Sequence, residues 1–212
     1  MRKGITAVVI IALLGTGGYF AYNQIFAGIK TVTAEDGTKY RINMEAVKEN
    51  AGFAKSDADG NLTPLEENDP DAASVAAVVM EWADKTSNRS WEDVTGDEEY
   101  HLYSESLKKV LINEQDDINQ TRMGYEAQQT ATQASNIKAT NVVIFSDGKH
   151  AYAVCEWDST LLHSIDLEGA KEVGFDGIGS TKQNRTEFEL EKDSNGDWKI
   201  TAVNNISDWK VR

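Results

Sequence analysis

The sequence predicts an α+β domain, in which a helical layer packs on a curved four-stranded antiparallel sheet, preceded by a transmembrane helix. Two hairpin patterns occupy the C-terminal half, amphipathic helical patterns precede them, and an uncharged run opens the chain. We expect an anchor over residues 1–29, a juxtamembrane hairpin, short helix and linker over 30–70, and an extracytoplasmic α+β domain over 71–212.

The strands are predicted by two hairpin patterns. In Ile137–Thr160, β-branched and aromatic residues flank the pair Asp147-Gly148, which tolerates the positive φ of a tight turn. A second hairpin joins Thr186–Glu191 to Trp198–Ala202 through another Asp/Asn/Gly turn. Its first strand alternates, so we expect its apolar residues to face the core and its three glutamates to face solvent. The connector between the hairpins is expected to be a flexible excursion.

Three helices are expected before the sheet. The first, Asp71–Thr86, places apolar residues at i, i+3, i+4 and i+7, with Asp71 as its N-cap. The second, Gly96–Ile112, carries a stripe of tyrosine, leucine and valine. The third, Glu114–Gln133, is more polar, which is compatible with a position over a sheet edge or with contact to a partner.

The N-terminal region predicts a membrane span followed by a short hairpin and helix. Arg2 and Lys3 precede an uncharged run, Gly4–Ile29, that is long enough to cross the hydrocarbon core and ends in aromatic residues. A cleaved signal peptide is the alternative, but no clear small-x-small site follows the apolar core. We expect an uncleaved anchor, a cytoplasmic N-terminus, a hairpin over Lys30–Ile42 and a helix over Met44–Asn50.

A stretch of the linker resembles part of an EF-hand loop. Asp57, Asp59 and Glu66 fall on calcium-ligand positions of that loop. Lys55, however, occupies the place of the first acidic ligand, and its positive charge would repel the ion. We therefore interpret the stretch as a polar turn in a linker, with a calcium-responsive surface protein as an alternative.

Composition narrows the function classes. The net charge is −14 and the 21 basic residues are scattered, which argues against binding to nucleic acid. The single cysteine, Cys155, excludes an intramolecular disulfide and a multi-cysteine metal site, and we expect it to be a small buried residue.

No stretch carries a catalytic signature. Five residues of reactive type lie outside any metal-ligand or nucleophile-elbow spacing: His101, His150, His163, Ser159 and Ser164. We therefore predict no catalytic, metal-binding or cofactor-binding residues and no cofactor. If the domain is instead an enzyme or a small-molecule binder, only His150, Glu156 and Asp158 are placed to approach a pocket mouth.

The order of elements resembles a known fold. Three helices followed by an antiparallel meander that closes with DSNGDWKITAV resemble the nuclear-transport-factor-two-like, or cystatin-like, fold over Ala72–Val211. An anchor with an external domain of this shape resembles the eighth VirB component of type IV secretion systems and similar proteins of Gram-positive conjugative elements. The resemblance implies a non-enzymatic membrane scaffold that contacts other membrane-complex proteins in a conjugative-transfer channel, with self-association left open.

Overall fold

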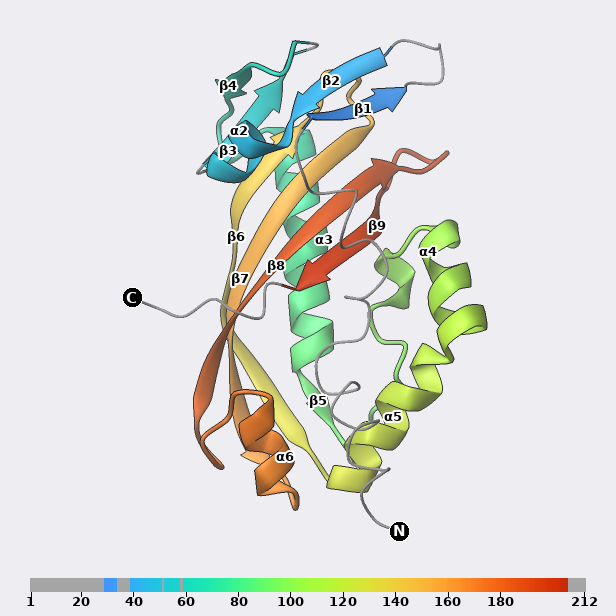
Figure 1. Cartoon of the computed structure of the whole chain (residues 1–212), viewed down its shortest axis with the longest axis vertical. Helices are drawn as coiled ribbons and strands as arrows, with labels where there is room; N and C mark the ends of the chain where they lie inside the picture. The colour runs from blue at the N-terminus through green and yellow to red at the C-terminus, as the bar shows by residue number, and fades with distance from the viewer. Residues whose placement is uncertain (1–28, 34–38, 51, 58, 206–212) are drawn as a thin grey trace.

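The structure is a computed structural model that describes residues 29–33, 39–50, 52–57 and 59–205. It confirms a mixed α+β architecture with a helical layer on a mostly antiparallel sheet (Figure 1). The main sheet has seven strands, whereas the sequence predicted four. None of the helices in the described ranges combines the length and apolar character that a membrane crossing requires. The span predicted over residues 4–29 lies outside these ranges except for its last residue.

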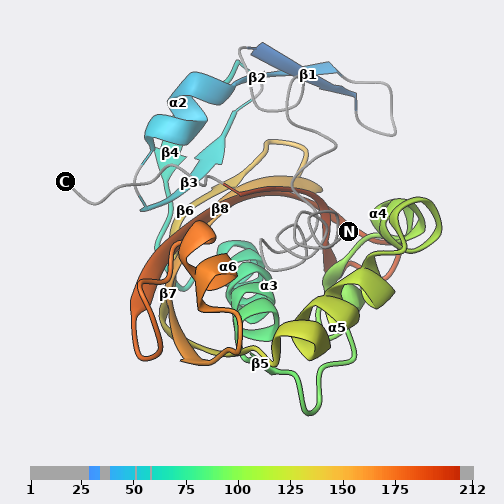
Figure 2. The same ribbon diagram turned by 60° about the horizontal axis from the view of Figure 1, so that its bottom comes forward.

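The strand order of the main sheet is β4-β3-β6-β7-β8-β9, and β5 adds to the free part of β6. Neighbouring strands are antiparallel except β3 and β6, which are parallel. The sheet curves around helix α3 (Figure 2). The strands are β3 (Gly52–Ser56), β4 (Leu62–Pro64), β5 (Arg89–Ser90), β6 (Ala131–Ile144), β7 (His150–His163), β8 (Thr181–Lys192) and β9 (Trp198–Asn205).

The predicted central hairpin is confirmed as β6 and β7, and both strands are longer than the pattern indicated. Gly148 has a φ of +66° in the connecting turn. The third helix was predicted to reach Gln133, and its Gln-rich end, residues 126–135, was left open between exposed helix and a lead-in to the first strand. In the structure the helix ends at Gln128, and residues from Ala131 onward form the start of β6. Helix α5 (Asp117–Gln128) ends because Gln129 adopts the left-handed conformation, with its N–H directed to carbonyls of the last turn.

The first predicted helix is confirmed as α3 (Pro70–Ser87), but its N-cap is Asp69. The Asp69 carboxylate accepts hydrogen bonds from the backbone N–H groups of Asp71 and Ala72, both at 3.1 Å. Pro70 occupies the first helical position. An N–H at this position has no partner within the helix, so the missing N–H of proline costs no intrahelical hydrogen bond. The prediction of Asp71 as the cap was therefore wrong by two residues.

The second predicted helix is broken into three pieces. They are η1 (Tyr100–Leu102), α4 (Glu105–Lys109) and the π-helical turn η2 (Val110–Glu114). The break occurs because Tyr103 is extended and bridges to Ile200 of β9, while the Ser104 N–H donates to the Ile200 carbonyl at 2.9 Å. The Ser104 hydroxyl then accepts from the Leu107 N–H and begins the next helix.

The main hydrophobic core lies between α3 and the facing side of the sheet. Val75, Val79 and Trp82 of α3 pack in one cluster with Phe188 and Leu190 of β8. The inward direction predicted for these two β8 side chains is confirmed, since each is at most 1% exposed.

A second core covers part of the opposite face, which the sequence predicted to be charged and solvated. Helix α2 (Met44–Glu49) contributes Val47 to this cluster, and the Asn141 side chain of β6 donates to the Val47 carbonyl at 2.7 Å. Glu187 is consequently only 5% exposed, and it accepts a hydrogen bond from Asn204 at 3.0 Å. The expected solvent position holds for Glu191, which is exposed.

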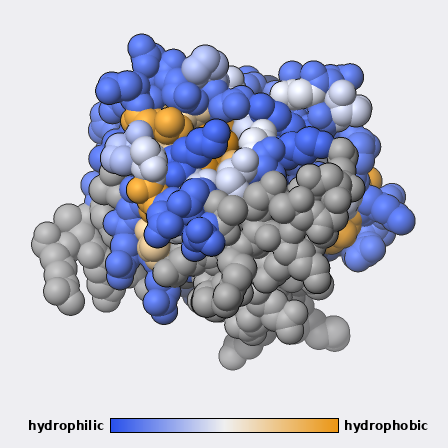
Figure 3. All heavy atoms as spheres, turned by 90° about the horizontal axis from the view of Figure 1, so that it is seen from above, coloured by the Kyte–Doolittle hydropathy of each residue, from blue (hydrophilic) through white to orange (hydrophobic). Residues whose placement is uncertain are grey.

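The described residues between 29 and 64 contain a hairpin and, in the predicted linker, two further strands. The predicted hairpin is confirmed as β1 (Ile29–Thr33) paired with β2 (Lys39–Asn43), although its tip lies outside the described residues. The segment after α2 forms β3 and β4. Seen from the end that carries β1 to β4, the coloured part of the surface is mostly hydrophilic, with a few separate apolar areas (Figure 3).

The connector between the two hairpins is also structured. It contains helix α6 (Leu167–Glu172), which packs in a small apolar cluster of its own with the end of β7. The expectation of a flexible excursion was therefore wrong. The cluster consists of Leu161, Ala170, Val173 and Phe175.

Candidate functional site

Glu156 and Asp158 lie on the face of β7 that points away from α3. Side chains alternate between the two faces of a strand, and the neighbouring Cys155 and Trp157 belong to the main core. Glu156 and Asp158 must therefore point to the opposite face. Glu156 pairs with Lys138 at 3.5 Å and with Arg185 at 3.7 Å. Asp158 accepts a hydrogen bond from the Asn136 side chain at 2.7 Å. Both carboxylates therefore belong to a polar surface outside the helix-covered interior.

His150 is the first residue of β7. Glu156 is six positions further along the strand, a distance of about 20 Å, so the acid/base trio considered from the sequence is not assembled. Its Nδ1 lies 2.5 Å from Asp147 Oδ2 in the hairpin turn. Burial opposes the charge of Asp147, but hydrogen bonds from the turn hold the pKa of this carboxyl below its usual range. His101 pairs with Glu81 at 2.9 Å on an exposed surface.

The EF-hand-like stretch forms the turn between β3 and β4. Asp57 Oδ1 accepts hydrogen bonds from the backbone N–H groups of Asp59 and Asn61, and its Oδ2 accepts one from the Asn61 side chain, each at 2.9 Å. The Asn61 amide and these backbone donors lower the pKa of Asp57. Within the described residues, no three His, Cys, Asp or Glu side chains are placed to hold a metal ion. Asp57 is thus a turn-forming residue.

Cys155 is fully buried in the main core, as the sequence predicted. Burial raises the pKa of its thiol to about 12, so the thiol is protonated at neutral pH. Its place in the structure is that of a small apolar side chain.

The remaining residues of reactive type make structural hydrogen bonds. Ser159 accepts one from the Asn184 side chain at 2.9 Å. Ser164 accepts one from the Asp166 N–H at 3.1 Å. His163 Nδ1 lies 2.7 Å from a backbone carbonyl oxygen at the end of α5.

A buried ionic network between the helices and the sheet was not predicted from the sequence. The Arg89 side chain is 2% exposed and pairs with Glu99, and its distance to Glu98 is 3.1 Å. Tyr103 Oη accepts a hydrogen bond from Trp82 Nε1 at 2.8 Å and lies 3.5 Å from Glu99. Burial opposes the charge of Arg89, but the carboxylate of Glu99 raises its pKa above the usual value. The network joins α3, β5 and η1.

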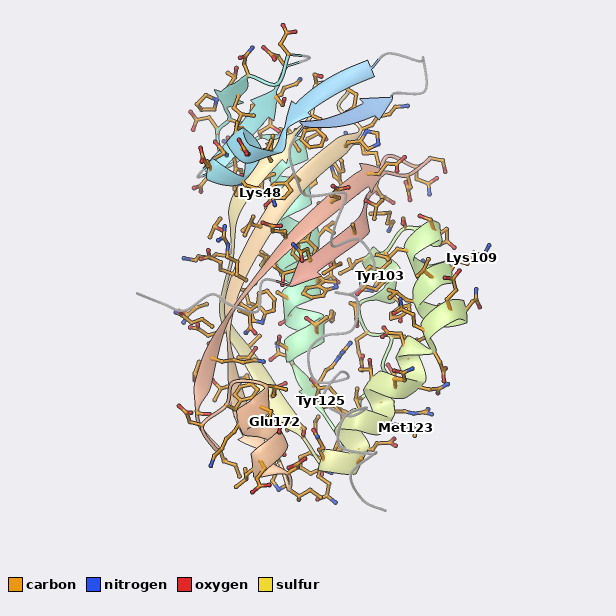
Figure 4. The ribbon with its side chains drawn as sticks, in the orientation of Figure 1. Lys48, Tyr103, Lys109, Met123, Tyr125 and Glu172 are labelled. Atoms are coloured by element: carbon orange, nitrogen blue, oxygen red, sulfur yellow. The ribbon has the colours of Figure 1, made fainter. Side chains whose placement is uncertain are left out.

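Tyrosines extend this network toward α5. Tyr100 Oη donates to Asp117 at 2.7 Å, and both burial and this carboxylate raise the pKa of the phenol. Tyr103 and Tyr125 point into the space between helices and sheet, whereas Met123 points outward (Figure 4). Burial raises the pKa of both inward phenols as well. Protonated phenols and paired charges fit a role in holding the helical layer against the sheet.

The most unusual surface feature is a group of exposed apolar side chains, which we call the lower-end patch. Six large apolar side chains are exposed in the described part of the chain, and four of them fall within residues 162–178. These four are Leu162 (49% exposed), Ile165 (61%), Leu167 (43%) and Ile178 (57%). Isolated exposed apolar residues are normal, but a concentration of them in one segment is not.

A β-bulge turns Leu162 toward solvent. Thr132 of β6 pairs with Leu161, and the residue before it, Ala131, pairs with His163. Leu162 is therefore the extra residue of β7, and such an insertion re-aims a side chain.

Backbone hydrogen bonds bring Ile178 beside this bulge. The Gly179 N–H donates to the Leu161 carbonyl at 2.7 Å, and the Leu161 N–H donates to the Ser180 carbonyl at 3.0 Å. Leu161 itself is buried against α6. The loop that carries Ile178 thus runs alongside the end of β7.

The other two patch residues are held by α5 and α6. The Ile165 N–H donates to the Gln128 carbonyl at 2.9 Å. Asp166 caps α6 by accepting from the Gly169 N–H at 2.9 Å, and Leu167 begins that helix. The patch is therefore built on positioned backbone.

No family model matches the chain, and a search of curated proteins gave no match. Among solved structures, the intermembrane-space region of the chloroplast protein ARC6 aligns with a TM-score of 0.36 and 13% identity, over 68% of this chain and 98% of that one. An NTF2-like superfamily protein from Salmonella enterica subsp. enterica serovar Typhimurium str. LT2 aligns with a TM-score of 0.29 and 15% identity, over 45% of this chain and 63% of that one. At these scores, neither alignment supports an inference about function.

Proposed function

We propose that this chain is a membrane-anchored assembly protein of a conjugative-transfer, type IV secretion-like channel, and that it acts through protein–protein contacts at the lower-end patch. The observation that carries the proposal is the concentration of exposed Leu162, Ile165, Leu167 and Ile178 at one end of the domain. Exposed apolar groups of this kind mark surfaces that another molecule covers. The candidate acid/base residues, in contrast, are dispersed.

The position of the patch suits contact with a partner away from the membrane. The predicted anchor leads into β1, and β1 lies at the opposite end of the molecule from α6 (Figure 1). In an anchored chain, the patch would then face away from the lipid.

The scaffold also suits recognition. Three of the patch residues lie on a bulged strand, a hydrogen-bonded loop and a capped helix, and Ile165, between β7 and α6, is hydrogen-bonded to the end of α5. Little backbone freedom therefore remains to be lost on binding. The buried Arg89–Glu99 pair holds the neighbouring helical layer in place. A preorganised apolar surface gains more net affinity than a mobile one.

Site-specific photo-crosslinking in the native host tests the proposal. The full chain would carry p-benzoylphenylalanine at Ile165, or at Lys109, an exposed residue of α4, as control. We expect adducts with other membrane-complex components of the transfer channel from position 165 and not from position 109. The proposal fails if position 165 gives no adduct with such a component. Conjugation frequency of an Ile165→Asp strain, expected to fall with the chain still present at normal level, is the independent readout.

A further inference from the structure

We infer that the lower-end patch binds a basic amphipathic helix of the partner protein. This inference rests on the proposed contact function and adds the chemistry of the partner. The charged residues of the same segment, residues 162–178, support it.

The segment that forms the patch is acidic. Residues 162–178 contain four carboxylates and one lysine: Asp166, Glu168, Glu172, Asp176 and Lys171. Three of the carboxylates, on Glu168, Glu172 and Asp176, belong to exposed residues, and we call these three the acidic rim. The fourth, on Asp166, caps α6. Lys171 is also exposed, so the exposed charge of the segment remains negative. An apolar surface with a negative rim is complementary to an apolar surface with a positive rim.

Charges from neighbouring elements do not reverse this sign. Lys182 of β8 donates to the Val173 carbonyl at 3.0 Å and lies 4.7 Å from the centre of the Phe175 ring, so its ammonium group is directed inward. On α5, Arg122 is matched by Glu126 at 4.0 Å. Neither of these two cations therefore reverses the negative charge of the rim.

The same charges argue against two other occupants. A second copy of this chain would bring two acidic rims together, and like charges at an interface oppose association. An anionic lipid surface would repel the rim for the same reason. A helix with leucine-type residues at i, i+3, i+4 and i+7 and lysine or arginine beside them would cover the apolar side chains and pair with the rim.

A peptide-capture experiment tests this partner class. The full chain, in phosphatidylcholine nanodiscs, would carry p-benzoylphenylalanine at Ile178. It would be offered three peptides of about 18 residues, a length sufficient for a helix. One has a leucine face flanked by lysines, one has the same leucine face flanked by glutamates, and one is a scrambled lysine version. We expect at least about tenfold more covalent adduct with the lysine amphipathic peptide than with either of the others.

Charge reversal provides the sharper comparison. In the Glu168→Lys, Glu172→Lys variant, we expect the preference to shift toward the glutamate peptide. The matched control is Glu105→Lys, Glu114→Lys, which makes the same change in net charge at exposed positions of α4 and η2. This control should keep the original preference. Circular dichroism of each variant verifies that the fold is retained.

The outcomes separate this inference from the proposed function. Equal or stronger capture of the glutamate peptide, or adducts mainly between two copies of the chain, overturns the basic-helix partner. Adducts with channel components in cells would then still support the contact function. Absence of both peptide adducts and cellular adducts overturns both.

Discussion

Arg89 shows how a single buried charge depends on its partners. Its side chain is almost completely removed from water, and Glu99 is equally buried beside it. Transferring either charge out of water costs several kcal/mol, which only a partner in direct contact can offset. The pair is therefore strongly coupled, and the two residues should be changed together as well as separately.

We predict that Arg89→Met lowers the free energy of unfolding by about 3–5 kcal/mol, because it leaves a buried carboxylate unpaired. The double variant Arg89→Met, Glu99→Leu should recover most of this loss. Urea unfolding followed by tryptophan fluorescence measures both. Arg122→Met, on the exposed surface of α5, serves as the control and should change stability by less than about 1 kcal/mol. Equal stability of Arg89→Met and the parent chain would contradict the prediction.

Lys182 gives a pH dependence. Burial lowers its pKa from 10.5 to about 8, so between these values the unfolded chain binds more protons than the folded one. The contribution of Lys182 to the free energy of unfolding therefore rises as the pH increases from about 8 toward 10.5. We predict a shallower rise over this window in Lys182→Met, measured by urea unfolding at several pH values. Lys171→Met, at an exposed position of α6, should retain the slope of the parent chain. The same slope in Lys182→Met would contradict the prediction.

At the scale of elements, boundaries are set by contacts that a helical pattern does not contain. The stripe over Gly96–Ile112 is real as a sequence pattern, but Tyr103 pairs with β9 and interrupts the helix. Likewise, α3 begins one residue before the predicted helix, because Asp69 rather than Asp71 caps its first turn. Helix propensity is weak compared with such tertiary and capping interactions.

We predict that Asp69→Ala destabilises the domain by about 1 kcal/mol, because two N–H groups of the first turn of α3 lose their acceptor. Thermal unfolding of the full chain measures the loss. Glu67→Ala removes an exposed carboxylate two residues earlier and should have little effect. A comparable loss from both substitutions would show that general charge, and not the cap, is responsible.

At the scale of the whole molecule, the sheet is covered on both faces over part of its area. The α3 side holds the main core, while on the other side α2 covers a second cluster, to which β3 contributes Ala54. Strand β3 is positioned by parallel pairing with β6, and the paired residues are 89 positions apart in sequence, as for Gly52 and Asn141. Local sequence patterns do not encode a contact of such long range.

We predict that the amides of β3 are protected from hydrogen exchange to a degree similar to those of β6, because β3 pairs with β4 on one side and β6 on the other. Hydrogen-exchange mass spectrometry of the full chain measures this. The exposed turn Asp193–Asp197 between β8 and β9, whose amide hydrogen bonds stay within the turn, is the fast-exchanging reference. Exchange of residues 52–56 as fast as that turn would indicate a detached linker and contradict the prediction.

The candidate site was less predictable than the fold. Ile165 and Ile178 stand in a segment without helical or strand periodicity, so nothing in the sequence indicated that both are exposed and held close to the end of β7. Arg89 and Glu99 gave no signal either, because charged residues outside a pattern are ordinarily solvated. The four exposed apolar residues among acidic ones can be identified only once the exposure of each side chain is known.

The sequence by itself determined the α+β class, the central hairpin, the first amphipathic helix and the inward direction of Phe188 and Leu190. These follow from turn chemistry and from periods of 2 and 3.6 residues, which are local properties. Only the tertiary structure decided the extra strands, the burial of Glu187, the broken second helix and the lower-end patch. Each of these features depends on which distant segment covers a given surface. The free energy of such a contact depends on both segments together, so neither segment's sequence pattern predicts it.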